Sequence, residues 1–257
     1  MDRRSLKLPF TLKKPADWIC PTCSKGLLRV ATKTFNKGEG YLSRDHSYEA
    51  WEPEWIQFIF SCNLICTNDR CQEVVACAGT GGVEERMYYD QEGETQVEYE
   101  EFFKPVFFHP HLLLVNIPEE CPETVSTPLK ESFRLFLCAP GAASNNVRIA
   151  IEELLTDLKV SRFTQANGER RFIPLHQRIT LLPKKFVHLK DQLLAIKWLG
   201  NAGSHSNGKI TFDDVMDSYD LVEHILHAVY AHKPKQLAAL AKRVNRKKGP
   251  AKVKAKP

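Results

Sequence analysis

The stretch Cys20-Pro-Thr-Cys23 places two thiols on one tight turn, and Cys66 and Cys71 form a second close pair with four residues between them. A Zn²⁺ ion takes four ligands in a tetrahedron, and two short-spaced pairs can supply them because each turn holds two sulfurs on one side of the metal. Four thiolates leave no open position for a substrate. The spacing therefore predicts a structural zinc site, which stabilises a module whose own core is small.

The other thiols carry no comparable signal. Cys62 is an alternative ligand to Cys66, although the eight residues between it and Cys71 make a long metal-binding turn. The remaining cysteines lack paired spacing and are expected to be small buried hydrophobic residues. These are Cys77, Cys121 and Cys138. With neither a secretory signal nor an apolar run of 18 residues, the chain is expected to be cytoplasmic, with reduced thiols and no membrane span.

Residues 1–117 are predicted to form a β-rich zinc-ribbon domain around these cysteines. The runs from Trp55 to Phe60 and from Glu73 to Ala78 are typical of strands, and Gly81-Gly82 is typical of a turn. The aromatic residues between Tyr41 and Phe60 form either a surface platform that stacks bases, at Trp51-Glu-Pro-Glu-Trp55, or part of the core. The acids in that stretch disfavour nucleic acid, so these residues are expected to pack in the core.

Residues 118–232 show a helical pattern, which begins after several prolines. Thr127-Pro128 predicts a helix start, because proline at the first helical position loses no hydrogen bond. The clearest amphipathic stripe lies between Val147 and Leu158, at helical spacing. A polar stretch from Thr164 to Arg171 separates it from two further helices, and a capping-box pattern, Thr211 with Asp214, starts the last one. The expected fold class is α+β, a zinc ribbon followed by an all-α bundle.

The charge distribution is uneven. The formal net charge is +5, yet residues 233–257 contain ten lysines and arginines and no acid, which leaves a net charge of −5 on the rest. This tail is predicted to be disordered and either to bind nucleic acid through phosphates or to be only a solvated end. The segment from Glu84 to Glu101 has eight acids and one arginine, and is expected to be an exposed hairpin or loop facing away from nucleic acid.

Two polar groups in the helical part are candidate site residues. Arg148 and Glu152 lie four apart on the flank of an apolar stripe, where they form either an exposed ion pair or a half-buried pair that organises a pocket. Asn201 and His205 are also four apart, and the small residues around them would let another backbone approach. The histidine is either a general acid or base or a helix-capping residue.

The helical part resembles a family of domains of unknown function, number 4145, which is assigned to the HEPN superfamily. Members are often fused to restriction-enzyme motor subunits or stand alone behind a zinc ribbon. The segments that carry the resemblance are Asn146 to Glu152, Arg178-Ile179, Ile196 to His205 and Thr211 to Asp214.

The resemblance implies a dimerising helical bundle and a link to nucleic acid and to defence against foreign DNA. Active HEPN ribonucleases use an arginine and a histidine without metal, the histidine assisting the ribose 2′-hydroxyl and the arginine steadying the phosphate. The corresponding catalytic set here is His205, Asn201, Lys197 and Arg148. The chain departs from the family pattern, because Gly200 stands five residues before the histidine and the nearest upstream cation is Lys197.

The sequence therefore predicts a nucleic-acid-associated accessory protein, acting in restriction or phage defence. Its basic tail would bind RNA or DNA and its bundle would form a homodimer. The alternatives are a metal-independent ribonuclease that uses His205 and a protein-interaction module.

Overall fold

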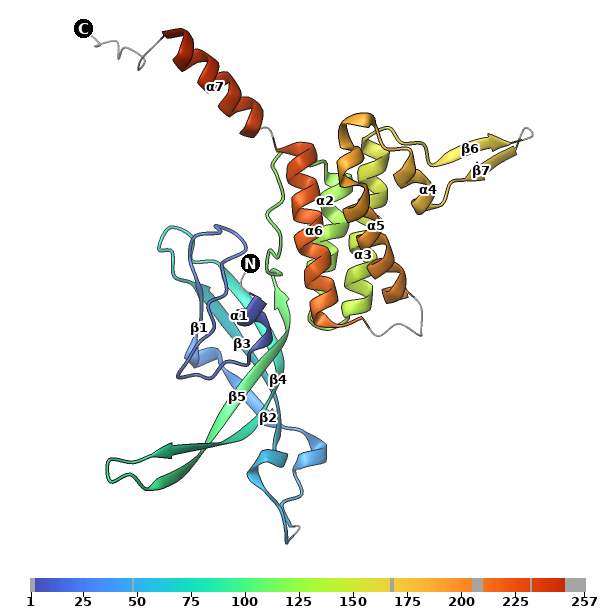
Figure 1. Cartoon of the computed structure of the whole chain (residues 1–257). Helices are drawn as coiled ribbons and strands as arrows, with labels where there is room; N and C mark the ends of the chain where they lie inside the picture. The colour runs from blue at the N-terminus through green and yellow to red at the C-terminus, as the bar shows by residue number, and fades with distance from the viewer. Residues whose placement is uncertain (1–2, 48, 167–168, 205–209, 232, 248–257) are drawn as a thin grey trace.

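The computed structural model describes residues 3–47, 49–166, 169–204, 210–231 and 233–247. A curled antiparallel β-sheet near the N-terminus is followed by a bundle of helices, and an extended linker over residues 110–122 joins them (Figure 1). The chain thus has the expected mixed α+β fold at this coarse level.

The sheet is built around one long, regularly alternating strand. Its order is β1-β3-β4-β5, and β2 also pairs with β3. The strands are β1 (Leu28–Val30), β2 (Asn36–Glu39), β3 (Gln57–Cys66), β4 (Val74–Tyr89) and β5 (Thr95–His109). Every second residue of β3 is buried, from Phe58 to Cys66, because successive side chains point to opposite faces of a strand. That buried face packs on an aromatic cluster containing Phe10, Trp18 and Phe103.

The predicted turn at Gly81-Gly82 is wrong, since β4 runs straight through both residues. The reason lies on the neighbouring strand. A β-carbon at Gly81 would lie 2.8 Å from the Phe103 ring, and one at Gly82 would lie 2.9 Å from the Phe102 ring. The glycines make room for these aromatic side chains, which local sequence cannot reveal.

The segment between β2 and β3 lies largely outside the core. It contains two short 3-10 helices, Tyr41–Ser43 and Pro53–Trp55, and another, Thr32–Thr34, precedes β2. Tyr41 and Leu42 are 85% and 87% exposed and Trp55 is 49% exposed. The expectation that this aromatic stretch packs in the core is therefore wrong for these residues.

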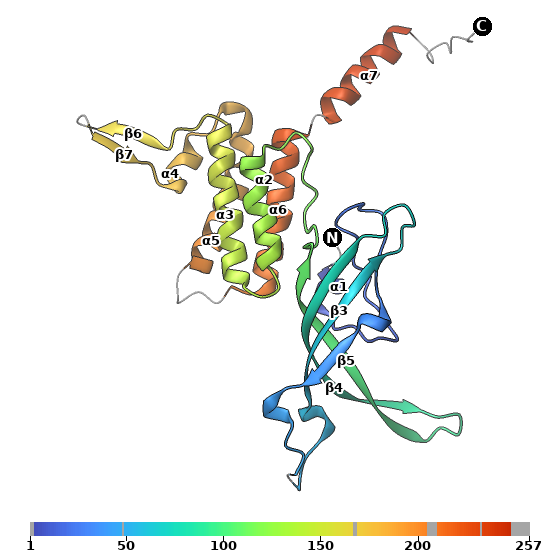
Figure 2. The same ribbon diagram turned by 180° about the vertical axis from the view of Figure 1, so that it is seen from behind.

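Four helices form the bundle, and Figure 2 shows α2 and α3 from the side opposite Figure 1. They are α2 (Glu123–Leu135), α3 (Pro140–Asp157), α5 (Lys190–Ser204) and α6 (Phe212–Tyr230). The predicted stripe on α3 is buried from Val147 to Leu155. The predicted helix start at Pro128 is wrong, because α2 begins five residues earlier and buries Val125 in its first turn. Thr124, whose carbonyl finds no N–H at Pro128, is exposed to solvent.

The helical part is not all-α. The polar stretch after α3 forms a hairpin of β6 (Phe163–Ala166) and β7 (Glu169–Phe172), which projects from the bundle (Figure 1). A short helix, α4 (Leu175–Thr180), and the 3-10 helix Lys184–Leu189 then lead into α5. Strand pairing there follows from Phe163 opposite Phe172, whose rings lie 5.9 Å apart edge to face.

Helix α6 also contacts the N-terminal part. The predicted capping box is present at its start, with the Thr211 side chain accepting from the Asp214 N–H and Asp214 accepting from the Thr211 N–H. Arg3, on the short helix α1 (Arg3–Lys7), pairs with Asp217 at 2.8 Å and with Asp220. The linker is held as well, because Glu223 accepts from the Asn116 N–H at 3.1 Å.

The predicted disordered tail begins with a helix, α7 (Lys233–Lys247), so the expectation is wrong for those residues (Figure 1). Alanine, leucine, lysine and arginine dominate this stretch, and all of them favour helix. None of the helices in the described ranges is both long and apolar enough to cross a membrane.

Candidate functional site

The first cysteine pair lies on a turn that the backbone closes tightly. The Cys20 N–H donates to the Gly26 carbonyl at 2.9 Å, and the Ser24 N–H donates to the Cys20 carbonyl at 3.0 Å. Ser24 adopts a left-handed backbone conformation, with φ of 52°. The turn therefore presents the Cys20 and Cys23 thiols on one side.

The second pair lies on an equivalent turn at the end of β3. The Cys71 N–H donates to the Asn68 carbonyl at 2.8 Å, and Gln72 has a φ of 49°. Strand pairing connects the turns, because β1, directly after the first, lies beside the end of β3 with Leu28 opposite Cys66.

The four sulfurs converge. All four Sγ atoms lie within 4.8 Å of one another, with Cys23 to Cys66 at 3.6 Å and Cys20 to Cys71 at 3.9 Å. Zn–S bonds of about 2.3 Å in a tetrahedron separate the sulfurs by about 3.8 Å. The four cysteines thus lie close enough to hold a metal ion, and their spacing is compatible with zinc.

The surroundings of the sulfurs fit thiolate ligands. The Gly26 N–H donates to Cys23 Sγ and the Asn68 N–H donates to Cys66 Sγ, both at 3.4 Å. The N–H groups of Gly26 and Lys25 lower the pKa of Cys23 to about 6, whereas burial raises the pKa of Cys66 to about 12. Four crowded sulfurs cannot all be thiolates without a cation, so this donor set suits a divalent metal.

The remaining cysteines lie elsewhere. Cys62 pairs with Cys77 across β3 and β4, and both are buried in the sheet, so Cys62 does not replace Cys66 in the cluster. Cys121 is partly buried. Cys138 is exposed just after α2, so the expectation that it is buried is wrong.

Arg148 and Glu152 form a half-buried ion pair on α3. Their side chains are 28% and 17% exposed, and Arg148 Nη1 donates to Glu152 Oε1 at 2.9 Å. Arg148 Nε also donates to Asn145 at 3.3 Å. The alkyl part of Arg148 lies against α5, because a β-carbon on Gly200 would lie 2.6 Å from Arg148 Cβ.

The other predicted polar residues lie on α5. Lys197 is 8% exposed, and its Nζ lies 3.2 Å from the centre of the Trp198 ring. Asn201 is partly exposed one turn further on. His205 lies outside the described residues. The expected close backbone approach is present at Gly203, where a β-carbon would lie 2.5 Å from the Gly141 carbonyl oxygen on α3.

Arg178 has a structural role that the sequence did not indicate. It is fully buried and donates to the carbonyls of Glu152 and Val160, each at 3.1 Å, and to Thr156 Oγ1 at 2.9 Å. A cation at the C-terminal end of α3 interacts favourably with the helix dipole. The apolar residues around it in α4 were the only signal for its burial.

A cleft of about 780 Å³ lies between the N-terminal part and the bundle. Linker residues 112–119 and Trp18 line it, together with four carboxylates. These belong to Asp17, Glu119, Glu123 and Glu223. The acids disfavour a phosphate ligand there. Among the described candidates, none of Arg148, Lys197 and Asn201 lines this cleft.

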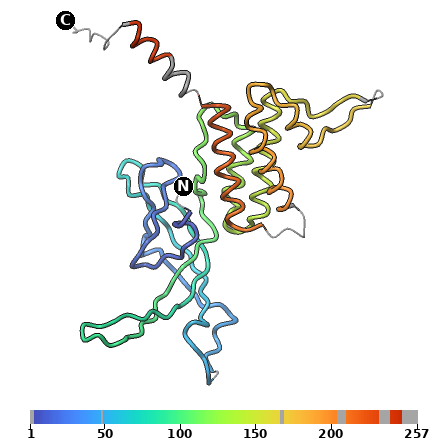
Figure 3. The backbone as a smooth tube through the Cα atoms, in the orientation of Figure 1, coloured from blue at the N-terminus to red at the C-terminus, as the bar shows by residue number. Residues whose placement is uncertain are grey.

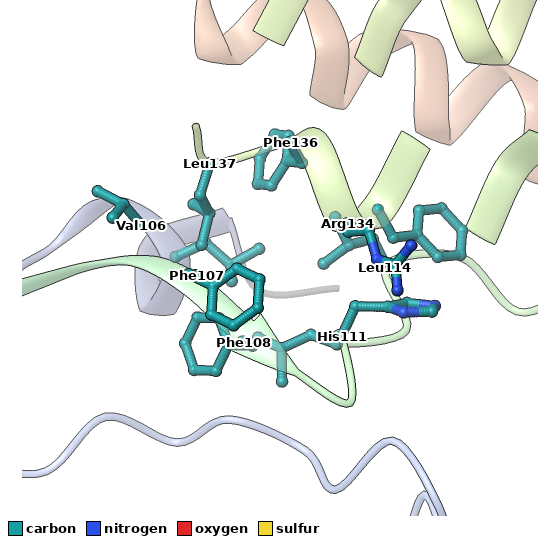
Figure 4. A pocket seen from close by; sticks show the side chains of 11 residues that line it. Val106, Phe107, Phe108, His111, Leu114, Arg134, Phe136 and Leu137 are labelled. Carbon is teal, nitrogen blue, oxygen red and sulfur yellow. The ribbon is translucent and has the colours of Figure 1, made fainter. Parts of the chain in front are cut away.

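A second hollow lies where β5 and the linker meet α2. Figure 4 shows Phe107, His111, Arg134 and Phe136 around it. Its volume is about 10 Å³, enough for one water molecule and too small for a ligand.

Two family models match separate parts of the chain. Residues 8–108 match a Domain of unknown function (DUF8608), and residues 130–247 match a Domain of unknown function (DUF4145). The resemblance to the 4145 family is thus confirmed for the helical part, while the sheet part matches a different model. No curated protein and no solved structure matches the chain.

Proposed function

We propose that the protein is a nucleic-acid-associated accessory protein, acting in restriction or phage defence, with a HEPN-type helical domain. The observation that carries the proposal is α7. Its described side chains include the exposed cations Lys242, Arg243 and Arg246, and no acid follows Glu223 in the sequence. Cations on a helix that stands clear of the bundle can follow a phosphate backbone.

The four-cysteine cluster would bind structural Zn²⁺. The sulfur spacing, the N–H···S bonds and the full set of four thiol ligands all support this role. When bound, the ion would cross-link the turn of Cys20 and Cys23 to the turn of Cys66 and Cys71, and it would not take part in catalysis. Cys20, Cys23, Cys66 and Cys71 would thereby hold the start of the sheet against the end of β3.

The β6–β7 hairpin supports the proposal as a second cationic element. Its Phe163 and Phe172 are 40% and 56% exposed, and the Arg170 guanidinium lies 3.7 Å from the centre of the Phe163 ring. Exposed aromatic rings beside arginines are typical of surfaces that stack unpaired bases. The hairpin and α7 extend from the same end of the bundle (Figures 1 and 3).

Fluorescence anisotropy with labelled RNA and DNA oligonucleotides across a salt series tests the proposal. Each phosphate contact that is lost should lower the slope of log K against log salt by about 0.9 for duplex DNA. Alanine at Lys242, Arg243 and Arg246 should reduce both affinity and slope, whereas alanine at Lys130 on α2 should change neither. Unchanged binding after removal of residues 233–257 would exclude a role for α7.

A metal-independent ribonuclease is the second candidate, favoured by the packing of Arg148 against Gly200, beside Lys197 and Asn201 on α5. In this function His205 would assist the attacking 2′-hydroxyl. RNA cleavage should then persist in EDTA and disappear in His205→Ala. Cleavage that is retained in the variant contradicts the candidate.

A further inference from the structure

The distal part of the β4–β5 hairpin, residues 84–101, exposes an apolar face that nothing in the described chain covers. We call it the acidic arm. Strand β3 stops pairing with β4 at Gly82, so beyond that point β4 and β5 pair only with each other. An isolated two-stranded ribbon is marginally stable in water unless one face packs on something.

The pairing register of β4 and β5 places the side chains of the arm on two opposite faces. Met87 lies opposite Val97, and the flanking pairs Glu85–Tyr99 and Tyr89–Thr95 share their side, because residues two apart point the same way. We define the docking face as four large side chains that are 47–78% exposed. They are Met87, Tyr89, Val97 and Tyr99.

The rim of the docking face is acidic. Burial raises the pKa of Tyr99, and so do three nearby carboxylates, those of Glu54, Glu85 and Glu52. Within the described ranges, none of these three carboxylates forms an ion pair. The opposite face is already neutralised in part, because Arg86 pairs with Glu84 and Glu100 at 2.8 Å.

A surface that is apolar in the middle and acidic at its rim fits a basic amphipathic helix, and this chain contains one. On α7, Leu240 and Val244 lie one turn apart and are 42% and 44% exposed. The cations Lys242, Arg243 and Arg246 flank them and are exposed. The docking face and α7 are therefore complementary both in charge and in exposed apolar surface.

The arm and α7 of one chain extend from opposite ends of the molecule (Figures 1 and 2). Only two residues separate α6 from α7, which is a reach of about 7 Å. We infer that α7 of a second copy docks on the acidic arm. Each copy offers one arm and one α7, so two copies can exchange both contacts in a closed twofold dimer. This inference goes beyond the proposed function and does not depend on it, although the arm and a nucleic acid would compete for the same three cations of α7.

Sedimentation of the full chain, free of nucleic acid, tests the inference. We expect a dimer whose dissociation constant rises about tenfold or more between 50 and 500 mM NaCl, since salt screens exposed charges. Tyr89→Ser on the docking face should weaken the dimer, and Tyr88→Ser on the opposite face is the matched control. A monomer under all conditions, or a dimer that both variants leave equally stable, would overturn the inference.

Charge exchange provides the sharper test. One variant carries lysine at Glu52, Glu54 and Glu85, and another carries glutamate at Lys242, Arg243 and Arg246. Each alone should be monomeric, because the rim of its docking face and the three substituted positions on its α7 then have the same sign. Their equimolar mixture should form a heterodimer. Failure of the mixture to associate, with each variant folded by circular dichroism, excludes the arm and α7 as partners, whether or not the chain binds nucleic acid.

Discussion

Gly26 and Cys66 lie so close together that a β-carbon on Gly26 would sit 2.4 Å from Cys66 Sγ. The two residues belong to different turns, so their contact fixes how the turns face each other. The thiol cluster therefore depends on a residue that is not itself a ligand.

Gly26→Ala is expected to displace Cys66 and to lower metal affinity, because real β-carbons do not approach other atoms that closely. The overlap should cost about 1–3 kcal/mol of stability. Gly38→Ala is the control, since nothing lies within 4 Å of a β-carbon there. Metal content by mass spectrometry and the melting temperature measure the effect, and a Gly26→Ala protein with full metal content would contradict it.

Cys23→Ser removes one sulfur of the proposed metal site and is expected to abolish metal binding and loosen the sheet core. Trp18, which is 4% exposed and donates to the Ser5 carbonyl, reports on that core. Its fluorescence is expected to shift to the red in the variant and in chain treated with a strong chelator. Cys138→Ser, an exposed cysteine outside the cluster, should leave the emission unchanged. The same shift in both variants would argue against the metal centre.

Gly203→Ala distinguishes helix propensity from packing by the sign of its effect. Propensity alone predicts a gain of about 1 kcal/mol. The contact with Gly141 on α3 instead predicts a loss of about 1–3 kcal/mol, because the β-carbon meets the neighbouring backbone. Urea denaturation measures the difference, and increased stability would contradict a close contact between Gly203 of α5 and Gly141 of α3.

Arg178→Met should cost about 2 kcal/mol or more, since it removes the buried group that donates hydrogen bonds to the Glu152 and Val160 carbonyls and to Thr156 Oγ1. Arg171→Met, at a side chain that is 60% exposed, should change the unfolding free energy by about 0.5 kcal/mol or less. Comparable losses in the two variants would show that the hydrogen bonds of Arg178 are not stabilising.

The capping box of α6 predicts a pH dependence. Hydrogen bonds from the Thr211 side chain and N–H lower the pKa of Asp214. A carboxyl with a lowered pKa in the folded state stabilises the protein above its unfolded pKa, and this contribution disappears as the pH falls through the folded pKa. Asp214→Asn should therefore lower stability at pH 7 by about 1 kcal/mol and have little effect near pH 2. Melting curves across this range provide the check.

Local patterns predicted those elements whose determinants are local. The stripe on α3 and the Thr211–Asp214 cap needed only residues three and four apart, and the two cysteine pairs needed only short spacings. Their convergence on one another also followed, because tetrahedral ligation requires it.

The errors involve distant partners. Gly81-Gly82 alone favours a turn, but the two glycines lie in a strand because they make room for the Phe102 and Phe103 rings of β5. Thr127-Pro128 alone favours a helix start, but the helix begins earlier and buries Val125. The burial of Arg178 depends on acceptors 18–26 residues earlier in the chain. No window of local sequence contains these contacts.

The salt bridges of Arg3 have a consequence for dissecting the molecule. Asp213, Asp217 and Asp220 lie along one side of α6, where three carboxylates repel one another, and Arg3 and Lys7 of α1 offset this repulsion. A fragment that contains the helical part but lacks residues 1–7 of the chain would leave these three aspartates without their cationic partners. Helix α1 thus links the N-terminal sheet part to the helical bundle, and the two parts should unfold together in one calorimetric transition.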